Sequence, residues 1–254
     1  MPPISAVIIA HNEADSIARV LRSLACADEL LVVDSGSTDG TREVAADLGA
    51  RVLTNPWPGY AAQKNFAAEQ ARQDWILSLD ADEELDAEAQ AAVLGWKASN
   101  PPPDVAGYRF ARRARFLGRW IRHSGWYPDY KLRLFDRRRG RWQGGYVHEA
   151  VEVAGAIETL PGEILHYTCD SLEEFSERIE RYAELSAREM LEHSRNPSAL
   201  LRLVAPPGRF LRAYFLRLGF LDGPEGFLIA RMEARYARKK FSKLAELRAR
   251  TKKP

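Results

Sequence analysis

The sequence predicts an α/β protein with a mostly parallel sheet that has a mixed edge, followed by a basic helical C-terminal extension. Short apolar runs alternate with helix-length segments up to residue 79, which is typical of right-handed βαβ units. After the prolines at 101–103, strand-like runs follow one another directly, and after residue 170 long helical segments begin. We therefore expect a domain at 1–168, with halves at 1–100 and 101–168, and an extension at 169–254.

The first half contains four predicted strands and three predicted helices. Apolar runs predict the strands, and the helix between the first two carries Ile17, Val20, Leu21 and Leu24 at helical spacing. Asn12 is the expected N-cap of that helix, and Gly49 is expected to end the second helix. The predicted strands cover residues 4–10, 29–34, 51–54 and 75–79, and the predicted helices cover residues 13–25, 41–48 and 60–71.

Later elements have a different pattern. Ser171 and Glu174 form a capping box that predicts a helix reaching about His193. Pro206 and Pro207 are expected to break the chain, since proline removes a backbone donor. Four further strands are predicted over residues 107–110, 130–135, 147–153 and 163–167, and two basic amphipathic segments over residues 210–221 and 226–247.

Composition is that of a folded globular protein, with 46% hydrophobic and 28% charged residues among 254. Two cysteines, Cys26 and Cys169, are too few for a disulfide framework and predict a reducing compartment. The N-terminus enters a strand pattern without a leader-like segment, so a cytoplasmic protein is expected. No run of about 18 apolar residues predicts a membrane span.

Charge is distributed unevenly along the chain. Residues 195–254 hold 15 Lys or Arg and 4 Asp or Glu, although the whole chain has a net charge of only +2. Such a basic segment favours an anionic partner. Residues 210–220 mix Phe, Tyr and Leu with Arg, which suits a membrane interface, while docking of the apolar stripe on the catalytic domain is the alternative. Nucleic acid is not expected, because the segment is too apolar for a simple phosphate-backbone binder.

Acidic residues follow the predicted strands where ligands gather in open α/β sheets. Asp80 and Asp82 end the fourth strand, and two oxygen donors there suit a hard divalent cation. Asp34 ends the second strand and could accept from a ribose hydroxyl or a base N–H, whereas Asp39 could instead cap the next helix. His11 and Glu13 follow the first strand, and Lys64 lies near the start of the third helix. The sequence has no dinucleotide-binding or P-loop glycine motif.

Four motifs in this order resemble the family 2 glycosyltransferases: residues 8–13, 32–41, 63–65 and 79–83. Residues 126–129, 133–135, 147–149 and 219–223 resemble the bacterial branch that adds β-linked glucose to the lipopolysaccharide inner core. The resemblance implies the GT-A fold and an inverting hexosyl transfer to a lipid-linked inner-core sugar, with UDP-glucose as the favoured donor. It also implies that the protein acts at the cytoplasmic face of the inner membrane.

The resemblance also implies roles for individual residues. Asp34 would hold uracil or ribose, Asp82 would bind Mg²⁺ or Mn²⁺ directly, and Asp80 would contact ribose or reach the metal through water. His11, Glu13, Asp39 and Lys64 match further substrate-binding positions.

Inversion needs a base for the acceptor hydroxyl. In many relatives that base is in a Glu-Asp or Asp-Asp motif, which here is replaced by Val147, His148 and Glu149. We favour Glu149, with His148 as its orienting partner or a diphosphate contact, while a surface pair is the alternative. Arg133 could clamp the diphosphate, and Trp126 could form an acceptor platform or pack in the core.

Two other classes remain open at this point. A haloacid-dehalogenase-like phosphoryl transfer enzyme also places Asp-x-Asp after a strand, although Glu84 stands here where Thr or Val is usual. A non-enzymatic membrane-surface module built on the basic extension is the third possibility.

Overall fold

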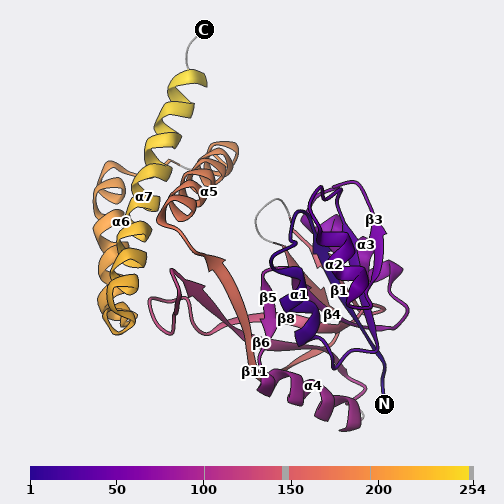
Figure 1. Cartoon of the computed structure of the whole chain (residues 1–254). Coiled ribbons are helices and arrows are strands. Elements are labelled where there is room, and N and C mark those ends of the chain that lie inside the picture. The colour runs from indigo at the N-terminus through magenta and orange to yellow at the C-terminus, as the bar shows by residue number, and fades with distance from the viewer. Residues whose placement is uncertain (100, 145–148, 195, 252–254) are drawn as a thin grey trace. The chain divides into compact units, whose positions relative to one another are not determined.

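The computed structural model describes residues 1–99, 101–144, 149–194 and 196–251, and the chain divides into two compact units (Figure 1). Unit 1 comprises Met1–Arg112 and Asp129–His166, and unit 2 comprises Arg113–Pro128 and Tyr167–Pro254. The predicted boundary after residue 168 lies two residues from the end of unit 1. The predicted acceptor half, however, contains residues 113–128, which the structure groups with the helical extension.

The βαβ region of unit 1 has the predicted elements. Four strands and three helices alternate, as the alternation of apolar runs and amphipathic segments indicates. The strands are β1 (Ile4–Ala10), β2 (Glu29–Asp34), β3 (Arg51–Thr54) and β4 (Trp75–Asp80), and the helices are α1 (Ile17–Ser23), α2 (Thr41–Asp47) and α3 (Tyr60–Gln70).

The start of α1 differs from the prediction. Asn12 is not its N-cap: its backbone is in the left-handed region at φ 57°, and its Oδ1 accepts a 2.9 Å hydrogen bond from Thr38 N. The chain instead makes a turn in which Ser16 N and Ile17 N donate to Glu13 O, and α1 begins at Ile17. The Asn12 side chain therefore joins the turns that follow β1 and β2.

The remaining elements of unit 1 are mostly antiparallel strands. Helix α4 and strands β5 and β9 were not predicted, because α4 follows β4 too closely to stand out as a separate pattern. The bounds are β5 (Glu83–Leu85), α4 (Ala87–Ser99), β6 (Val105–Phe116), β8 (Asp129–Asp136), β9 (Gly140–Gln143), β10 (Ala150–Val153) and β11 (Ala156–Cys169).

The main sheet has the order β3-β2-β1-β4-β8-β6-β11-β5. Strands β1 to β4 are parallel, β8 is antiparallel to β4 and to β6, and β5 is antiparallel to β11. The short strand β7 (Arg119–Trp120) pairs with β6, and β9 and β10 form a separate antiparallel pair. The α/β class with a mixed edge is thus confirmed.

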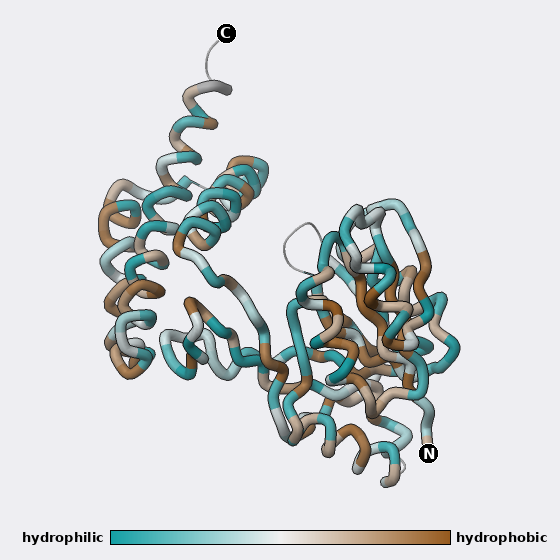
Figure 2. Tube along the Cα trace, viewed as in Figure 1, coloured by the Kyte–Doolittle hydropathy of each residue, from teal (hydrophilic) through white to brown (hydrophobic). Residues whose placement is uncertain are grey.

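Alternate residues of β1 serve two different cores. Ala6, Ile8 and Ala10 belong to a cluster with α1, α2 and α4, whereas Val7 packs with α3 and with Trp142 of β9. Because side chains alternate across a strand, the central strands are buried on both faces. Figure 2 shows the resulting hydrophobic run of the central strands.

Unit 2 is mainly helical, and α5 and α6 both pack along α7 (Figure 1). Ser171 is confirmed as the N-cap of α5, because its Oγ accepts from Glu174 N at 3.1 Å, whereas Glu174 Oε1 accepts from Arg178 at 3.1 Å. The elements are α5 (Leu172–Glu192), α6 (Ala199–Leu211), a π-helical turn η1 (Arg212–Leu216), a 3₁₀ turn η2 (Gly219–Asp222) and α7 (Gly223–Thr251). None of the described helices in either unit is long and apolar enough to cross a bilayer.

The predicted chain break at Pro206 and Pro207 is wrong, since both residues lie inside α6. A proline has the φ angle of a helix but costs about 3 kcal/mol in a helix interior through its missing donor and its ring clash. The helix nevertheless packs along α7: Arg209 forms a 2.8 Å ion pair with Glu233, and the Phe210 and Phe227 rings meet edge to face.

The Gly219–Gly223 motif turns the chain between α6 and α7. Asp222 is 3% exposed, and its carboxylate accepts from the backbone N–H groups of Arg122 at 3.0 Å and His123 at 2.9 Å. A Cβ on Gly226 would lie 1.8 Å from Gly219 O, so these two backbones can pack only without a side chain. The motif therefore has a structural role within unit 2.

Candidate active site

Strands β1, β2 and β4 end at one edge of the sheet. Ala10 is paired with Asp34, and Ile9 is paired with Asp80. Because neighbouring residues of a strand point to opposite faces, the Asp34 and Asp80 side chains share this edge but lie on opposite faces of the sheet. The predicted acids therefore lie at the same carboxyl edge but form two groups, one on each face of the sheet.

Asp34 organises its own turn. It is fully buried, and its Oδ1 accepts from Gly36 N and Ser37 N, both at 3.0 Å, while Oδ2 accepts from the Ser37 hydroxyl. Such local bonds are the usual reason for Asp at a turn. A contact between Asp34 and uridine stays a prediction.

The turns after β1 and β2 are tied together. Asp39 Oδ1 accepts from Thr41 N at 3.0 Å, but the N-cap of α2 is Gly40, so Asp39 lies one residue before the cap position; its Oδ2 accepts from Ala14 N at 3.1 Å. Glu13 N donates to Thr41 Oγ1 at 2.8 Å. His11 is exposed beside them.

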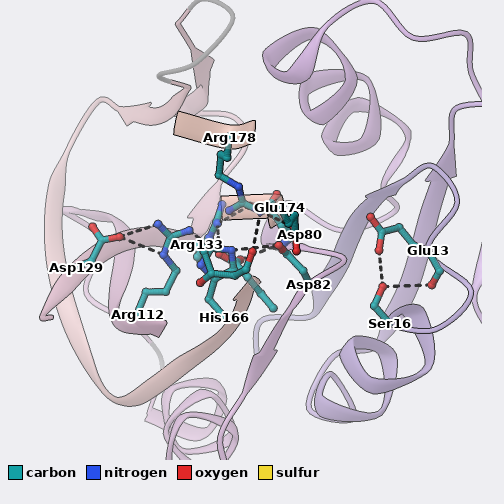
Figure 3. Close-up of polar contacts among 12 residues, drawn as sticks. Glu13, Ser16, Asp80, Asp82, Arg112, Asp129, Arg133, His166, Glu174 and Arg178 are labelled. Carbon is teal, nitrogen blue, oxygen red and sulfur yellow. Dashed lines mark hydrogen bonds and ion pairs between the residues drawn. The ribbon is translucent and has the colours of Figure 1, made fainter. Parts of the chain in front are cut away.

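Glu13 lies within electrostatic reach of Asp82. Burial raises the pKa of the Glu13 carboxyl above its usual value, its bond from Ser16 lowers it, and the charges of Asp82 and Asp39 raise it further. Figure 3 shows the Glu13–Ser16 pair, in which Ser16 Oγ donates at 2.5 Å. Residues of the first and fourth predicted motifs therefore belong to one electrostatic environment.

Asp80 is held by two cations. Its Oδ1 lies 2.7 Å from Lys64 Nζ, and its Oδ2 lies 2.8 Å from the Arg133 guanidinium. Burial alone would raise the pKa of Asp80, but Arg133 and Lys64 lower it far below the usual range, so the carboxylate stays charged. The structure thus joins three predicted site residues that lie on β4, α3 and β8.

A buried acid extends this network. Glu83 has no exposed surface, and its Oε1 accepts from Arg133 at 2.7 Å and from Arg112 at 3.0 Å. Its Oε2 also accepts from Asp80 N at 3.1 Å. Arg133 is 4% exposed, and its guanidinium is paired with Glu83 and Asp80 in this structure. Its predicted contact with a diphosphate stays a prediction.

Glu149 lies on the other side of Lys64. Its Oε1 is 3.3 Å from Lys64 Nζ, which also stands 4.3 Å from the centre of the Trp142 ring. A desolvated ammonium beside an aromatic face is fixed in position. The predicted base and the predicted cation of the helix α3 are therefore neighbours. His148 lies outside the described residues.

Asp82 is the most accessible acid of the Asp-x-Asp motif. Its side chain is 41% exposed, and its Oδ2 lies 3.1 Å from His166 Nε2 on β11 (Figure 3). Sequence reasoning gave no role to His166, Glu83 or Trp142. His166 lies within a predicted strand, but only the pairing of β11 with β5 brings it to Asp82.

A divalent cation would find few protein ligands here. Within the part of the chain that the structure describes, no three His, Cys, Asp or Glu side chains form a metal-binding group. Asp82 and His166 still fit an ion that takes its other ligands from phosphate oxygens and water, as Mg²⁺ commonly does. Asp80 fits less well as a direct ligand, because both of its oxygens already face cations.

Trp126 belongs to unit 2, unlike the other predicted site residues. Its ring packs against Phe116 at 5.6 Å and Phe175 at 5.9 Å between centroids, at the margin of an apolar cluster. This environment agrees with the alternative that Trp126 packs in the core. A role of Trp126 as an acceptor platform stays a prediction.

Comparison with known proteins identifies the class. Residues 5–157 match the model of glycosyl transferase family 2. The chain is 34% identical over 242 residues to the lipopolysaccharide core biosynthesis glycosyltransferase LpsC of Rhizobium meliloti (strain 1021), covering 92% of this chain and 89% of that protein. An uncharacterized glycosyltransferase of Rickettsia bellii (strain RML369-C) is 32% identical and covers 96% of this chain and 86% of its own length.

Solved structures resemble the chain more distantly. A glucosyl-3-phosphoglycerate synthase from Mycobacterium tuberculosis, in complex with Mn²⁺, UDP and glucosyl-3-phosphoglycerate, is 21% identical with a TM-score of 0.46. The match covers 78% of this chain and 82% of that one.

The protein is a glycosyltransferase, and it belongs to family 2. This confirms the family that its four ordered motifs resemble. The haloacid-dehalogenase-like and non-enzymatic alternatives are wrong, because the family model and the LpsC match both cover the Asp-x-Asp region as part of a glycosyltransferase domain.

Proposed function

We propose that this enzyme transfers a hexose, glucose from UDP-glucose, with inversion onto a lipid-linked sugar of the lipopolysaccharide core, and that it requires Mg²⁺ or Mn²⁺. The observation that carries the proposal is the Asp82–His166 pair at the carboxyl edge of the sheet, in which the Asp82 side chain is 41% exposed. The similarity of the chain to the lipopolysaccharide core glycosyltransferase LpsC supports a lipopolysaccharide core sugar as the acceptor. A lipid-linked acceptor would bring the enzyme to the cytoplasmic face of the inner membrane.

Asp82 and His166 would hold the cation, with Asp80 reaching it through water. When bound, the ion would stabilise the negative charge that develops on the departing diphosphate. Asp80 itself is oriented by Lys64 and Arg133, so these two cations position the acid rather than leave it free to turn away.

Glu149 would act as the base. It would accept the proton of the acceptor hydroxyl, whose oxygen forms the new bond to the anomeric carbon while the bond from that carbon to the diphosphate oxygen breaks. UDP leaves with the electron pair of that bond. Lys64, at 3.3 Å, would hold the Glu149 carboxylate in place during this step.

Release of UDP from UDP-glucose in the presence of Mn²⁺ or Mg²⁺ tests the metal site. We expect Asp82→Ala to lower the rate by at least about 10²-fold, because the ion would lose its accessible carboxylate ligand. Asp47→Ala removes an exposed carboxylate at the end of α2 and should leave the rate unchanged. Full activity of a folded Asp82→Ala protein would contradict the proposal, as would UDP release that chelators do not affect.

A further inference from the structure

Helix α6 exposes its apolar side chains. None of its residues is buried, and three of its leucines are largely exposed: Leu200 is 69% exposed, Leu203 is 74% exposed and Leu211 is 52% exposed. More than half of the large apolar side chains that are exposed in the described residues fall between residues 200 and 227. Soluble proteins seldom expose apolar side chains in one continuous patch without a partner for them.

The exposed side chains share one side of the helix. Arg209 marks the side that meets α7, through its ion pair with Glu233 and its stacking at 5.2 Å on Tyr236. At 3.6 residues per turn, Leu200 lies half a turn around the helix from Arg209. We call this exposed set the apolar surface; it consists of Leu200, Leu203, Val204 and Leu211 of α6 together with the exposed Phe215 and Leu216 of the π-helical turn η1 that follows.

Within the segment that carries the apolar surface, the charged residues have one sign. Residues 196–221 contain four arginines, at 202, 209, 212 and 217, and no Asp or Glu. The next acid, Asp222, is buried on backbone N–H groups and is not available to a partner. Arg209 is paired with Glu233, which leaves the other three arginines of this segment for a partner. Apolar side chains beside arginines match the interface of an anionic bilayer, where the apolar side chains enter the acyl boundary and the arginines meet lipid phosphates.

Aromatic rings continue the same region. Tyr214 contacts the rings of Phe210, Phe215 and Phe220 at 5.1–6.2 Å, and Phe215 and Phe220 are 52% and 45% exposed. This ring cluster holds the exposed side chains in a fixed arrangement beyond the end of α6. Figure 2 shows the hydrophobic stretches of α6 on the tube of unit 2.

We propose that the apolar surface of α6 and η1 is a membrane-docking face that inserts into the headgroup region of an anionic bilayer. The inference deepens the proposed function, because it assigns the residues that would bring the enzyme to a lipid-linked acceptor. It does not depend on the identity of the donor sugar or the metal.

Vesicle flotation with the full chain tests the proposal. We expect binding to vesicles of phosphatidylcholine with 30 mol% phosphatidylglycerol, and binding at least about tenfold weaker to phosphatidylcholine alone or at 0.5 M NaCl. Leu203→Gln combined with Leu216→Gln should weaken binding to the anionic vesicles by about tenfold or more. Arg212→Gln should weaken it less, and by a factor that shrinks as salt rises.

Matched controls separate this face from general hydrophobicity. Leu94→Gln with Ile157→Gln changes two exposed apolar side chains of unit 1, which are 53% and 48% exposed, and should leave binding unchanged. All variants should keep the wild-type circular dichroism spectrum and the wild-type UDP release from soluble donor. UDP release is measured without lipid, so a wild-type protein that binds anionic vesicles but releases no UDP would contradict the proposed function and leave the docking face supported.

Three results would overturn the inference. They are absence of wild-type binding to anionic vesicles at low salt, equal loss of binding in the unit 1 control, and a wild-type dimer in light scattering that Leu203→Gln with Leu216→Gln converts to a monomer. The last result would assign the apolar surface to a second copy of the chain instead.

Discussion

The two units depart from the usual burial of side chains in opposite ways. Unit 1 buries charges, with Glu83 fully buried and Arg133 4% exposed, and pairs them. Unit 2 exposes leucines, with Leu216 at 80% and Leu203 at 74%. Folding alone favours neither arrangement, since buried charges cost desolvation energy and exposed leucines forgo burial. Each unit therefore departs from ordinary packing where we propose that it meets a ligand.

The largest effect is expected from breaking the buried network of unit 1. Arg133→Met leaves Glu83 and Asp80 without their shared cation and should lower the free energy of unfolding by about 3–5 kcal/mol, measured by urea denaturation. Arg188→Met removes an exposed pair with Glu184 on α5 and should change it by less than about 0.5 kcal/mol. Equal effects of the two substitutions would show that the buried network of unit 1 contributes no more to the free energy of unfolding than an exposed ion pair.

Two leucines sharpen the comparison. Leu77 on β4 has no exposed surface, and Leu77→Ala should cost about 2–5 kcal/mol through lost burial and a cavity. Leu203→Ala on α6 should change the free energy of unfolding by no more than about 0.5 kcal/mol. Denaturation of both variants in the absence of lipid measures this, and a large loss for Leu203→Ala would mean that the side chain is covered within the chain.

Smaller, pH-dependent effects are expected from carboxylates that are paired in the fold. Glu29 is 8% exposed, and although burial raises its pKa, bonds from Ser5, Arg72 N and Arg51 bring it below the usual value. A lowered pKa means that the charged form stabilises the fold above the unfolded pKa of about 4.3, and that this contribution is lost as the pH falls through the folded value. Glu29→Gln should therefore cost about 1–3 kcal/mol at pH 7 and progressively less below pH 4.

Glu180 provides the corresponding test in unit 2. Its pKa is lowered chiefly by the hydrogen bond from Lys239, but its side chain is 33% exposed. Glu180→Gln should show the same sign of pH dependence with a smaller amplitude, because solvent screens the pair. Denaturation midpoints at pH 3, 5 and 7 compare the two, and an equal amplitude would contradict the difference in burial.

Much of unit 1 follows from local pattern. The strands β1 to β4 and the helices between them were predicted because each is an apolar run or an amphipathic segment that needs no distant information. The N-cap at Ser171 was predicted for the same reason, since its hydrogen bond spans three residues. The start of α1 was not, because Asn12 bonds to Thr38, which is 26 residues away, instead of capping its own helix.

The candidate site was predicted only in part. The position of Asp80 and Asp82 at a strand end, and the nearness of Lys64 and Arg133, follow from motif order and resemblance. The partners that define their states do not: His166 lies 84 residues from Asp82, and Arg133 lies 50 residues from Glu83. Strand pairing brings such residues together, and side-chain chemistry alone does not specify the pairing.

The sequence by itself determined the family, the parallel strands and the acids at their ends, because these depend on short periodicities and ordered motifs. Only the tertiary structure decided that Asp34 and Asp80 face opposite sides of the sheet, that α6 continues through Pro206 and Pro207, and that its leucines point outward. The reason is physical: register, long-range ion pairs and helix packing set the direction of each side chain, and each depends on elements distant in the chain.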